Sequence, residues 1–507
     1  MELNSGALWG RKPEQKGRRF QSLRANHSCE VSRREFFATL GALGAGSFLL
    51  GCSGSSSPSP LPSQPVPSGP ITASTVSISS TQSGTMPPRF VGLSYEKSKL
   101  SQPLFSGSNA NLIGLFKRLG PSLLRIGGNS VDETNWSPTG PGQTSGETAP
   151  SDVNALAGFL SATGWDVLYG VNLAQSTPAA AAAEVAYAAE ALGSDLVGIE
   201  IGNEPDLYPG HYFPATWTFS DYLALWQSFA SAILAQTPEV ALTGPVIADN
   251  TGWFSSFAQA EGKSVSLLSA HYYRGNGQAP SSTIQDLISY PDTNLENYLA
   301  ALKPPAAAVG VPFRLAETNS FYNGGAPNVS DSYASALWVI DHLFTIALGG
   351  SVGANLHGGG NSSGYTPIAD NNGVVVEARP EYYGAFLCTL AGQGPLLATT
   401  ISAGSLNISG YAVENSPKQW SVILVNKDET QNLHFTVTCP ATVVSAAMVV
   451  LTGPSLSATS GVTIQGSAVD PDGSFSPQPY YGLGVTGQTF TGYLPAASAV
   501  LVSVALE

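Results

Sequence analysis

The sequence of 507 residues has few charged residues, few histidines and few cysteines. Charged side chains make up 11% of the chain, and the 35 Asp and Glu outnumber the 21 Lys and Arg. A formal net charge of −14 opposes contact with nucleic acid, which needs clustered basic residues. The six histidines are scattered, and none has the spacing of a metal-binding motif. We therefore expect no nucleic-acid partner, no metal and no organic cofactor.

The N-terminal apolar stretch, residues 38–50, is too short to span a bilayer as a stable helix. It follows a pair of arginines at 33–34 and ends just before Cys52, an order typical of a twin-arginine export signal with a lipoprotein cleavage site. We expect residues 1–52 to form this signal and Cys52 to become a lipidated N-terminus, with cleavage and release as the alternative. Residues 53–70 are rich in Ser and Pro and would form a linker to the membrane. The protein would then be exported and be periplasmic, membrane-anchored or extracellular.

Two of the four cysteines, Cys29 and Cys52, lie in this signal, which leaves Cys388 and Cys439. One disulfide between these two and a pair of free thiols are both open. Residues 1–52 also hold eight of the 21 Lys and Arg, so the mature part keeps 13 and is strongly acidic. Such a body repels polysulfated polymers as well as nucleic acid.

Short apolar segments alternate with longer helix-compatible segments between about residues 88 and 380. This alternation is typical of βαβ units. Eight strands are predicted, at 89–95, 122–128, 166–173, 196–203, 240–245, 266–273, 313–318 and 353–358. The count predicts an α/β fold, a (β/α)8 TIM barrel over residues 88–380.

The pattern changes after about residue 380. Short β-rich segments separated by Gly, Pro, Asn and Ser follow one another to the end of the chain, which predicts an antiparallel β-sandwich over residues 381–507. A further strand is expected within residues 71–87, upstream of the barrel, and we expect it to join the sandwich.

Two glutamates stand where predicted barrel strands end, Glu204 after the fourth and Glu317 at the end of the seventh. The carboxyl ends of the strands form the catalytic rim of a TIM barrel. Hydrolysis of a glycosidic bond needs two carboxyl groups, one as proton donor and one as nucleophile or base. The amide of Asn203, beside Glu204, suits a hydrogen bond to a sugar 2-hydroxyl. The alternative is that these glutamates only cap helices or pair with arginine.

The motifs around these glutamates resemble those of a known family. Residues 203–205 (Asn-Glu-Pro), together with Glu317, resemble the clan A retaining glycosidases. Residues 315–327 and the His-Tyr-Tyr segment 271–273 resemble glycoside hydrolase family 79, the family of heparanase and microbial β-glucuronidases. The resemblance covers the predicted barrel, and it implies Glu204 as the acid/base and Glu317 as the nucleophile.

Ten residues are expected to bind the substrate: Asn203, His271, Tyr273, Tyr322, Asn323, Gly324, Tyr365, Glu96, Gly128 and Asn129. Tyr273 ends the sixth predicted strand, so its hydroxyl is expected near Glu317. The resemblance implies that Tyr322, the backbone of 323–324 and Tyr365 hold a uronate carboxylate.

The remaining members of this set have structural alternatives. Glu96 matches an acidic family position and is expected to contact sugar hydroxyls, but a solvated charge on the rim is the alternative. Gly128 and Asn129 follow the second strand and are expected to line the floor of the pocket, unless they form a purely structural turn.

The predicted function is a retaining exo-β-glucuronidase that removes terminal β-linked glucuronic acid from a glycan or glycoside. The chain lacks the basic clusters that cleavage of a sulfated polymer would need. The alternatives are another clan A exo-glycosidase, such as a β-xylosidase or β-glucosidase, and an endo-acting glucuronidase. A non-catalytic carbohydrate-binding lipoprotein is disfavoured because both glutamates and their neighbours are present. The sequence does not indicate an oligomeric state.

Overall fold

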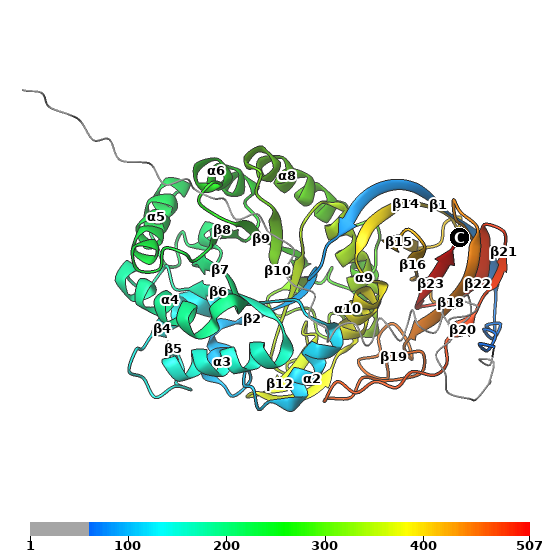
Figure 1. Ribbon diagram of the computed structural model, residues 1–507, viewed down its shortest axis with the longest axis horizontal. Helices are drawn as coiled ribbons and strands as arrows, with labels where there is room; N and C mark the ends of the chain where they lie inside the picture. Colours follow the sequence, from blue (N-terminus) through cyan, green and yellow to red (C-terminus); the bar gives the residue numbers. More distant parts are fainter. Residues whose placement is uncertain (1–59) are drawn as a thin grey trace, which may run out of the picture.

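The computed structural model describes residues 60–507. The predicted export signal, the lipidation site Cys52 and residues 53–59 lie outside this range. Within the described range, no helix is both long and apolar enough to cross a membrane. The chain forms two parts that lie side by side, a barrel surrounded by helices and a large β-sheet domain that contains the C-terminus (Figure 1).

The first part is a closed barrel of eight parallel strands. They are β2 (Val91–Glu96), β3 (Leu123–Gly127), β6 (Asp166–Val171), β7 (Leu196–Ile201), β8 (Leu242–Ile247), β9 (Leu267–Asn276), β10 (Phe313–Tyr322) and β11 (Ala354–Gly358). Each corresponds to one predicted strand, in the predicted order, so the TIM-barrel prediction is confirmed. β9 and β10 run further than expected because their pairing continues to Asn276 and Tyr322.

Helices surround the barrel (Figure 1). The longer ones are α2 (Ala110–Leu119), α3 (Pro150–Thr163), α4 (Pro178–Leu192), α5 (Phe219–Gln236), α6 (Thr251–Glu261), α8 (Thr293–Val309), α9 (Tyr333–Leu348) and α10 (Pro380–Ala391), with a short α7 (Ile284–Leu287). Local sequence defines their ends, as in α4, where Thr177 accepts a hydrogen bond from the Ala180 N–H and Pro178 occupies the first helical position. Gly193 ends the same helix with a positive φ.

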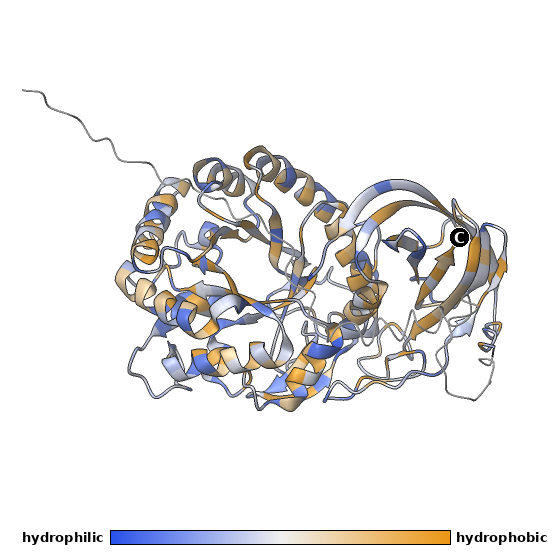
Figure 2. Cartoon of the chain, in the orientation of Figure 1, coloured by the Kyte–Doolittle hydropathy of each residue, from blue (hydrophilic) through white to orange (hydrophobic). Residues whose placement is uncertain are grey.

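The second part is an 11-stranded, mostly antiparallel sheet, which confirms the predicted β-sandwich. Its strands are β1 (Ile71–Met86), β14 (Gly394–Ser402), β15 (Ile408–Ser416), β16 (Gln419–Asn426), β17 (Asn432–Thr438), β18 (Val443–Thr452), β19 (Thr463–Ile464), β20 (Tyr481–Gly482), β21 (Gly484–Thr486), β22 (Thr489–Leu494) and β23 (Ser498–Leu506). β1 lies between β14 and β17. Figure 2 shows β18 and β23 as predominantly hydrophobic, and both are largely buried. Cys388 and Cys439 are buried free thiols.

Residues 60–70, the described part of the predicted Ser/Pro linker, run along this sheet. Ser63 forms a bridge with Gly482, and the Gln64 side chain exchanges hydrogen bonds with the backbone of Tyr493. Two small two-stranded sheets lie apart from the large one: β4 (Asn135–Trp136) with β5 (Glu147–Thr148), and β12 (Ile368–Asn371) with β13 (Val374–Ala378).

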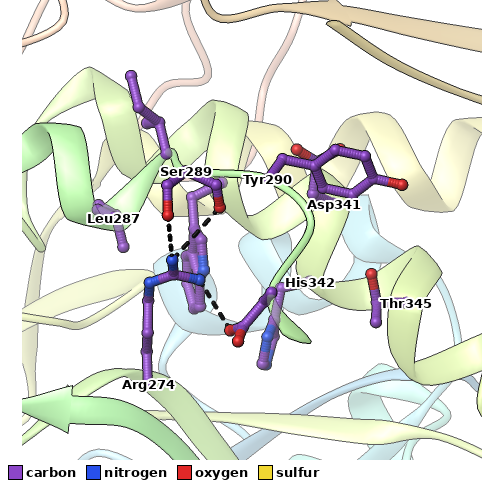
Figure 3. Close-up of a pocket in the computed structure, with 10 residues that line it drawn as sticks. Arg274, Leu287, Ser289, Tyr290, Asp341, His342 and Thr345 are labelled. Carbon is purple, nitrogen blue, oxygen red and sulfur yellow. Dashed lines mark hydrogen bonds and ion pairs between the residues drawn. The ribbon is translucent and has the colours of Figure 1, made fainter. Parts of the chain in front are cut away.

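A buried ion pair joins the two parts. Asp341 on α9 receives a hydrogen bond from the Lys427 ammonium, at 2.5 Å, and one from the Tyr411 hydroxyl. The small hollow in Figure 3 lies beside this pair, where Arg274, at the end of β9, donates to the Ser289 backbone and side chain. A buried charge needs such partners, because an isolated one destabilises the fold.

Candidate active site

Glu204 and Glu317 face one another at the rim of the barrel. Glu317 lies within β10 and is buried, whereas Glu204 follows β7 and is partly exposed. One carboxylate oxygen of each glutamate and one ring nitrogen of His271 all lie within 4.8 Å of one another. Glu317 stands at an irregularity in the pairing of β9 with β10, between Leu315 and Glu317. Such irregularities re-aim side chains near active sites.

The backbone of Glu204 is held in a strained conformation. Its φ is 50°, in the left-handed region that residues other than glycine rarely adopt. The Glu204 N–H donates to the carbonyl of Val246, 2.9 Å away, and Val246 itself has a φ of 61°. Two such residues cost on the order of 1–3 kcal/mol each, and strain of this kind clusters at functional sites.

Glu317 has a donor on each carboxylate oxygen. The Tyr273 hydroxyl donates to Oε1 at 2.6 Å, and the Arg125 Nη1 donates to Oε2 at 2.5 Å. Burial would raise the pKa of this carboxyl, but nearby positive charges, led by that of His357, hold it well below its usual range. Glu317 is therefore ionised at neutral pH.

Arg125 belongs to the candidate site although no sequence motif predicted it. It is fully buried in β3 and also donates to Glu200, at 2.6 Å, and to the Oδ1 of Asn203, at 2.8 Å. A buried arginine needs buried carboxylates as partners. Its position inside an apolar predicted strand could therefore have indicated that it pairs with glutamates of the barrel. Glu317 thus does pair with an arginine, as the alternative interpretation held, but it also faces Glu204.

The amide of Asn203 is oriented by two partners. Its Oδ1 accepts from Arg125, and its Nδ2 donates to the Oδ1 of Asn129 at 3.1 Å. The amide nitrogen has a second hydrogen that is available for a substrate hydroxyl.

Two histidines flank the glutamates. The Nδ1 of His271 lies 2.8 Å from the Oε1 of Glu204. His357, which the sequence analysis did not select, lies 3.6 Å from Glu317 through Nδ1 and 3.5 Å from Glu96 through Nε2. Burial would lower the pKa of His357, but the charges of Glu317 and Glu96 outweigh burial and raise it.

Glu96 is held by the turn that follows β3. Its Oε2 accepts from the backbone and hydroxyl of Ser130, and its Oε1 accepts from the backbone of Asn129 at 3.3 Å. Gly128 has a φ of 73°, and a Cβ there would lie 2.5 Å from the Glu96 carboxyl. Gly128 therefore allows the carboxylate to approach, and Glu96 reaches His357 rather than extending into solvent.

Of the residues expected to bind a uronate carboxylate, Tyr365 lies close to the glutamates, whereas Tyr322 and Asn323 lie further out at the end of β10. The Tyr365 ring lies 5.7 Å from the Tyr273 ring and 5.9 Å from the His357 ring, and burial raises its pKa. Tyr322 is 46% exposed at the end of β10, and the Asn323 side chain donates to Asn276.

The loops that carry these two groups are packed together. The Tyr365 N–H donates to the carbonyl of Gly324, and a Cβ at Gly364 would lie within 2 Å of the same oxygen. Only glycine at 364 permits this contact, which joins the loop after β10 to the loop after β11.

The cluster of Glu204, His271 and Glu317 has the donor atoms to hold a metal ion. However, the Arg125 guanidinium already occupies one oxygen of Glu317, and a second cation there would be repelled. The donor set fits proton transfer between carboxyl groups better than it fits a metal.

The fold and the paired carboxylates define a barrel of the glycoside hydrolase class. No protein-family model matches the chain. A β-glucuronidase of Aspergillus niger is 28% identical over 243 residues, which are 42% of this chain and 45% of that protein. Heparanase of Mus musculus is 27% identical over 208 residues, 38% of each chain. The chain thus matches less than half the length of these two relatives.

The fold is also found among solved structures. The 4-O-α-L-rhamnosyl-β-D-glucuronidase of Fusarium oxysporum 12S aligns with a TM-score of 0.69 and 21% identity, over 84% of this chain and 99% of that one. The chain is thus similar to β-glucuronidases and to heparanase, the proteins whose family its motifs resemble.

Proposed function

We propose that the protein is a retaining β-glucuronidase that removes terminal glucuronic acid from a glycan or glycoside. The observation that carries this proposal is that one carboxylate oxygen of Glu204 lies within 4.8 Å of one carboxylate oxygen of Glu317. Retaining glycosidases place their carboxyl groups about 5–5.5 Å apart, whereas inverting enzymes leave about 6.5–9.5 Å for a water molecule.

The chemistry follows from the contacts of the two glutamates. Glu317, ionised and aimed by Tyr273 and Arg125, attacks the anomeric carbon while Glu204 protonates the leaving oxygen. Glu204 then takes a proton from a water molecule whose oxygen attacks the anomeric carbon, and the bond to Glu317 breaks so that Glu317 leaves as a carboxylate. The Nδ1 of His271 lies 2.8 Å from Glu204 and orients its carboxyl group.

The uronate preference rests on the groups around Tyr365. Tyrosine hydroxyls and glycine-flanked backbone N–H groups can hold an anion, and the His357 ring lies 5.9 Å from the Tyr365 ring on the same side of the site. Relatives named for glucuronide cleavage support this choice. The contact between Gly364 and Gly324 joins two rim loops. The exo mode is favoured by the few basic residues of the chain, which suit a chain end better than a long acidic polymer.

A panel of chromogenic glycosides tests the proposal. The β-glucuronide should be hydrolysed far faster than the β-glucoside, β-xyloside and β-galactoside, and Glu204→Gln and Glu317→Gln should each abolish turnover. NMR of the first-formed product should show the β-anomer. Preference for a neutral sugar would favour another clan A exo-glycosidase, and loss of polymer viscosity ahead of monosaccharide release would favour an endo mode.

We also propose that the protein is exported and tethered through a lipid on Cys52. The order of the arginine pair at 33–34, the short apolar stretch and Cys52 supports this. Changing both arginines to lysine should trap precursor in the cytoplasm. Mass spectrometry of the mature N-terminus should find a diacylglyceryl cysteine, and an unmodified N-terminus would contradict the tether.

A further inference from the structure

Asp132 lies beneath the active site, and the mechanism above does not use it. It belongs to the short helical turn η2 (Asn129–Glu133) after β3 and is 1% exposed. Its Oδ1 accepts from the backbone of Leu173, at 2.9 Å, and of Ala174, at 3.0 Å. Its Oδ2 accepts from the Asn203 N–H, at 3.1 Å, and from the Tyr208 hydroxyl, at 2.5 Å.

These four hydrogen bonds connect the loops after three neighbouring barrel strands. η2 follows β3, Leu173 and Ala174 follow β6, and Asn203 follows β7. All four donors are uncharged, so these hydrogen bonds bring no positive charge to this buried carboxylate. Burial raises the pKa of Asp132 in spite of these bonds, which indicates that the group is held there at a cost in stability.

The bond to Asn203 constrains the active site. The Tyr208 hydroxyl lies 3.2 Å from the same N–H, and a Cβ at Gly202 would lie 2.6 Å from that hydroxyl. Asp132 and Tyr208 therefore fix the main chain of residues 202–203. A small displacement of this main chain would move the Asn203 amide away from Arg125.

We propose that Asp132 is a positioning residue, which holds the Asn203 backbone so that the Asn203 amide reaches the 2-hydroxyl of the bound sugar. The inference rests on the proposed glycosidase function, although it does not depend on which sugar is bound. A contact with the 2-hydroxyl strengthens in the transition state of glycoside hydrolysis, so its loss lowers kcat more than it raises KM.

The test compares Asp132→Asn with the wild type on a chromogenic glucuronide and on its 2-deoxy analogue. The substitution keeps the size of the side chain, but it replaces one carboxylate oxygen by an NH2 group. This group cannot accept the two hydrogen bonds that the replaced oxygen received. On the glucuronide, kcat should fall on the order of 100-fold, as for a catalytic group displaced by about 1 Å, with little change in KM. On the 2-deoxy substrate, which lacks the hydroxyl, kcat should fall much less.

Asp152→Asn is the matched control. Asp152 is also buried and accepts from two backbone N–H groups, those of Gln143 and Ala149, but it lies at the start of α3. Its replacement should lower the melting temperature and leave kcat on both substrates unchanged.

Tyr208→Phe provides a second variant if Asp132→Asn does not fold. It removes one donor to Asp132 and should show a smaller loss with the same dependence on the 2-hydroxyl. Equal losses on both substrates, or wild-type kcat in a folded Asp132→Asn protein, would overturn the inference. If the wild type prefers another sugar, the uronate proposal fails, and the same comparison with that sugar and its 2-deoxy form still tests Asp132.

Discussion

At the scale of single residues, the proposed function depends on how Glu317 keeps its charge inside the barrel. Its carboxylate is buried, yet the Tyr273 hydroxyl and the Arg125 guanidinium each occupy one oxygen. These two fixed donors take the place of water around the carboxylate, and the proposed mechanism uses this retained charge for nucleophilic attack.

Replacing Tyr273 by Phe should lower kcat about 10–100-fold, because hydrogen bonds to charged groups contribute about 1.5–3 kcal/mol. The lost donor stabilised the ionised form, so the pKa of Glu317 should rise. The acidic limb of the kcat/KM profile should therefore move to higher pH. Tyr272→Phe is the control, since its hydroxyl contacts Asp292 instead. An unmoved acidic limb in Tyr273→Phe would contradict the role.

Arg125 stabilises the fold as well as the site, because Glu200 and Glu317 share its charge. Replacing it by Gln should lower the free energy of unfolding by about 3–5 kcal/mol, the effect of leaving a buried charge unpaired. Adding Glu200→Gln should recover part of this loss. Urea denaturation measures both, with exposed Lys117→Gln as a control expected within about 0.5 kcal/mol of the wild type.

At the scale of elements, the loop between β11 and β12 carries Tyr365 and is held in place by Arg379. The guanidinium donates to the Ser362 carbonyl, at 2.6 Å, and to the Asn361 backbone and side chain. The loop owes its position to this arginine and to the glycine contact at 364.

Arg379→Gln should loosen this loop and raise KM for the glucuronide more than it lowers kcat, because Tyr365 is proposed to bind substrate rather than to react. Cleavage of the loop in limited proteolysis should also become faster. Glu377→Gln is the control, because Glu377 is exposed and contacts Arg379 only at 3.6 Å. An unchanged KM in a variant with a loosened loop would argue against substrate binding by Tyr365.

At the scale of the whole molecule, α10 lies between the barrel helices and the β-sandwich and begins with a buried carboxyl group. Glu381 is 1% exposed and accepts from the Asn319 amide, at 3.2 Å. Burial raises the pKa of Glu381 to about 8, so its carboxyl group is protonated at neutral pH.

Glu381 should make the protein less stable as pH rises. The folded pKa, about 8, lies above the unfolded value, about 4.3, so the unfolded chain loses this proton first. The stabilisation is complete below pH 4.3 and is lost progressively up to about pH 8. Thermal unfolding across this range should show a flatter profile for Glu381→Gln, whereas exposed Glu190→Gln should keep the wild-type slope. Parallel profiles for Glu381→Gln and the wild type would contradict this.

Much of the fold was predictable because each barrel strand can be recognised from its own local sequence. Each strand is buried on both faces and therefore appears as a short apolar run, which allowed eight strands to be placed in order. The ends of β9 and β10 were set too early because polar residues such as Arg274 and Asn319 interrupt the apolar runs, although the two strands stay paired beyond them.

The sequence by itself determined the barrel, the β-rich C-terminal part and the position of two glutamates at the ends of strands, since these depend on local hydrophobic patterns. Only the tertiary structure decided that Arg125 donates to Glu317 and that His357 lies between Glu317 and Glu96. The same holds for the hydrogen bond from the Asn203 N–H to Asp132. These contacts join strands and loops far apart in the chain. Closure of the barrel brings them together, and no local pattern records which side chains then meet.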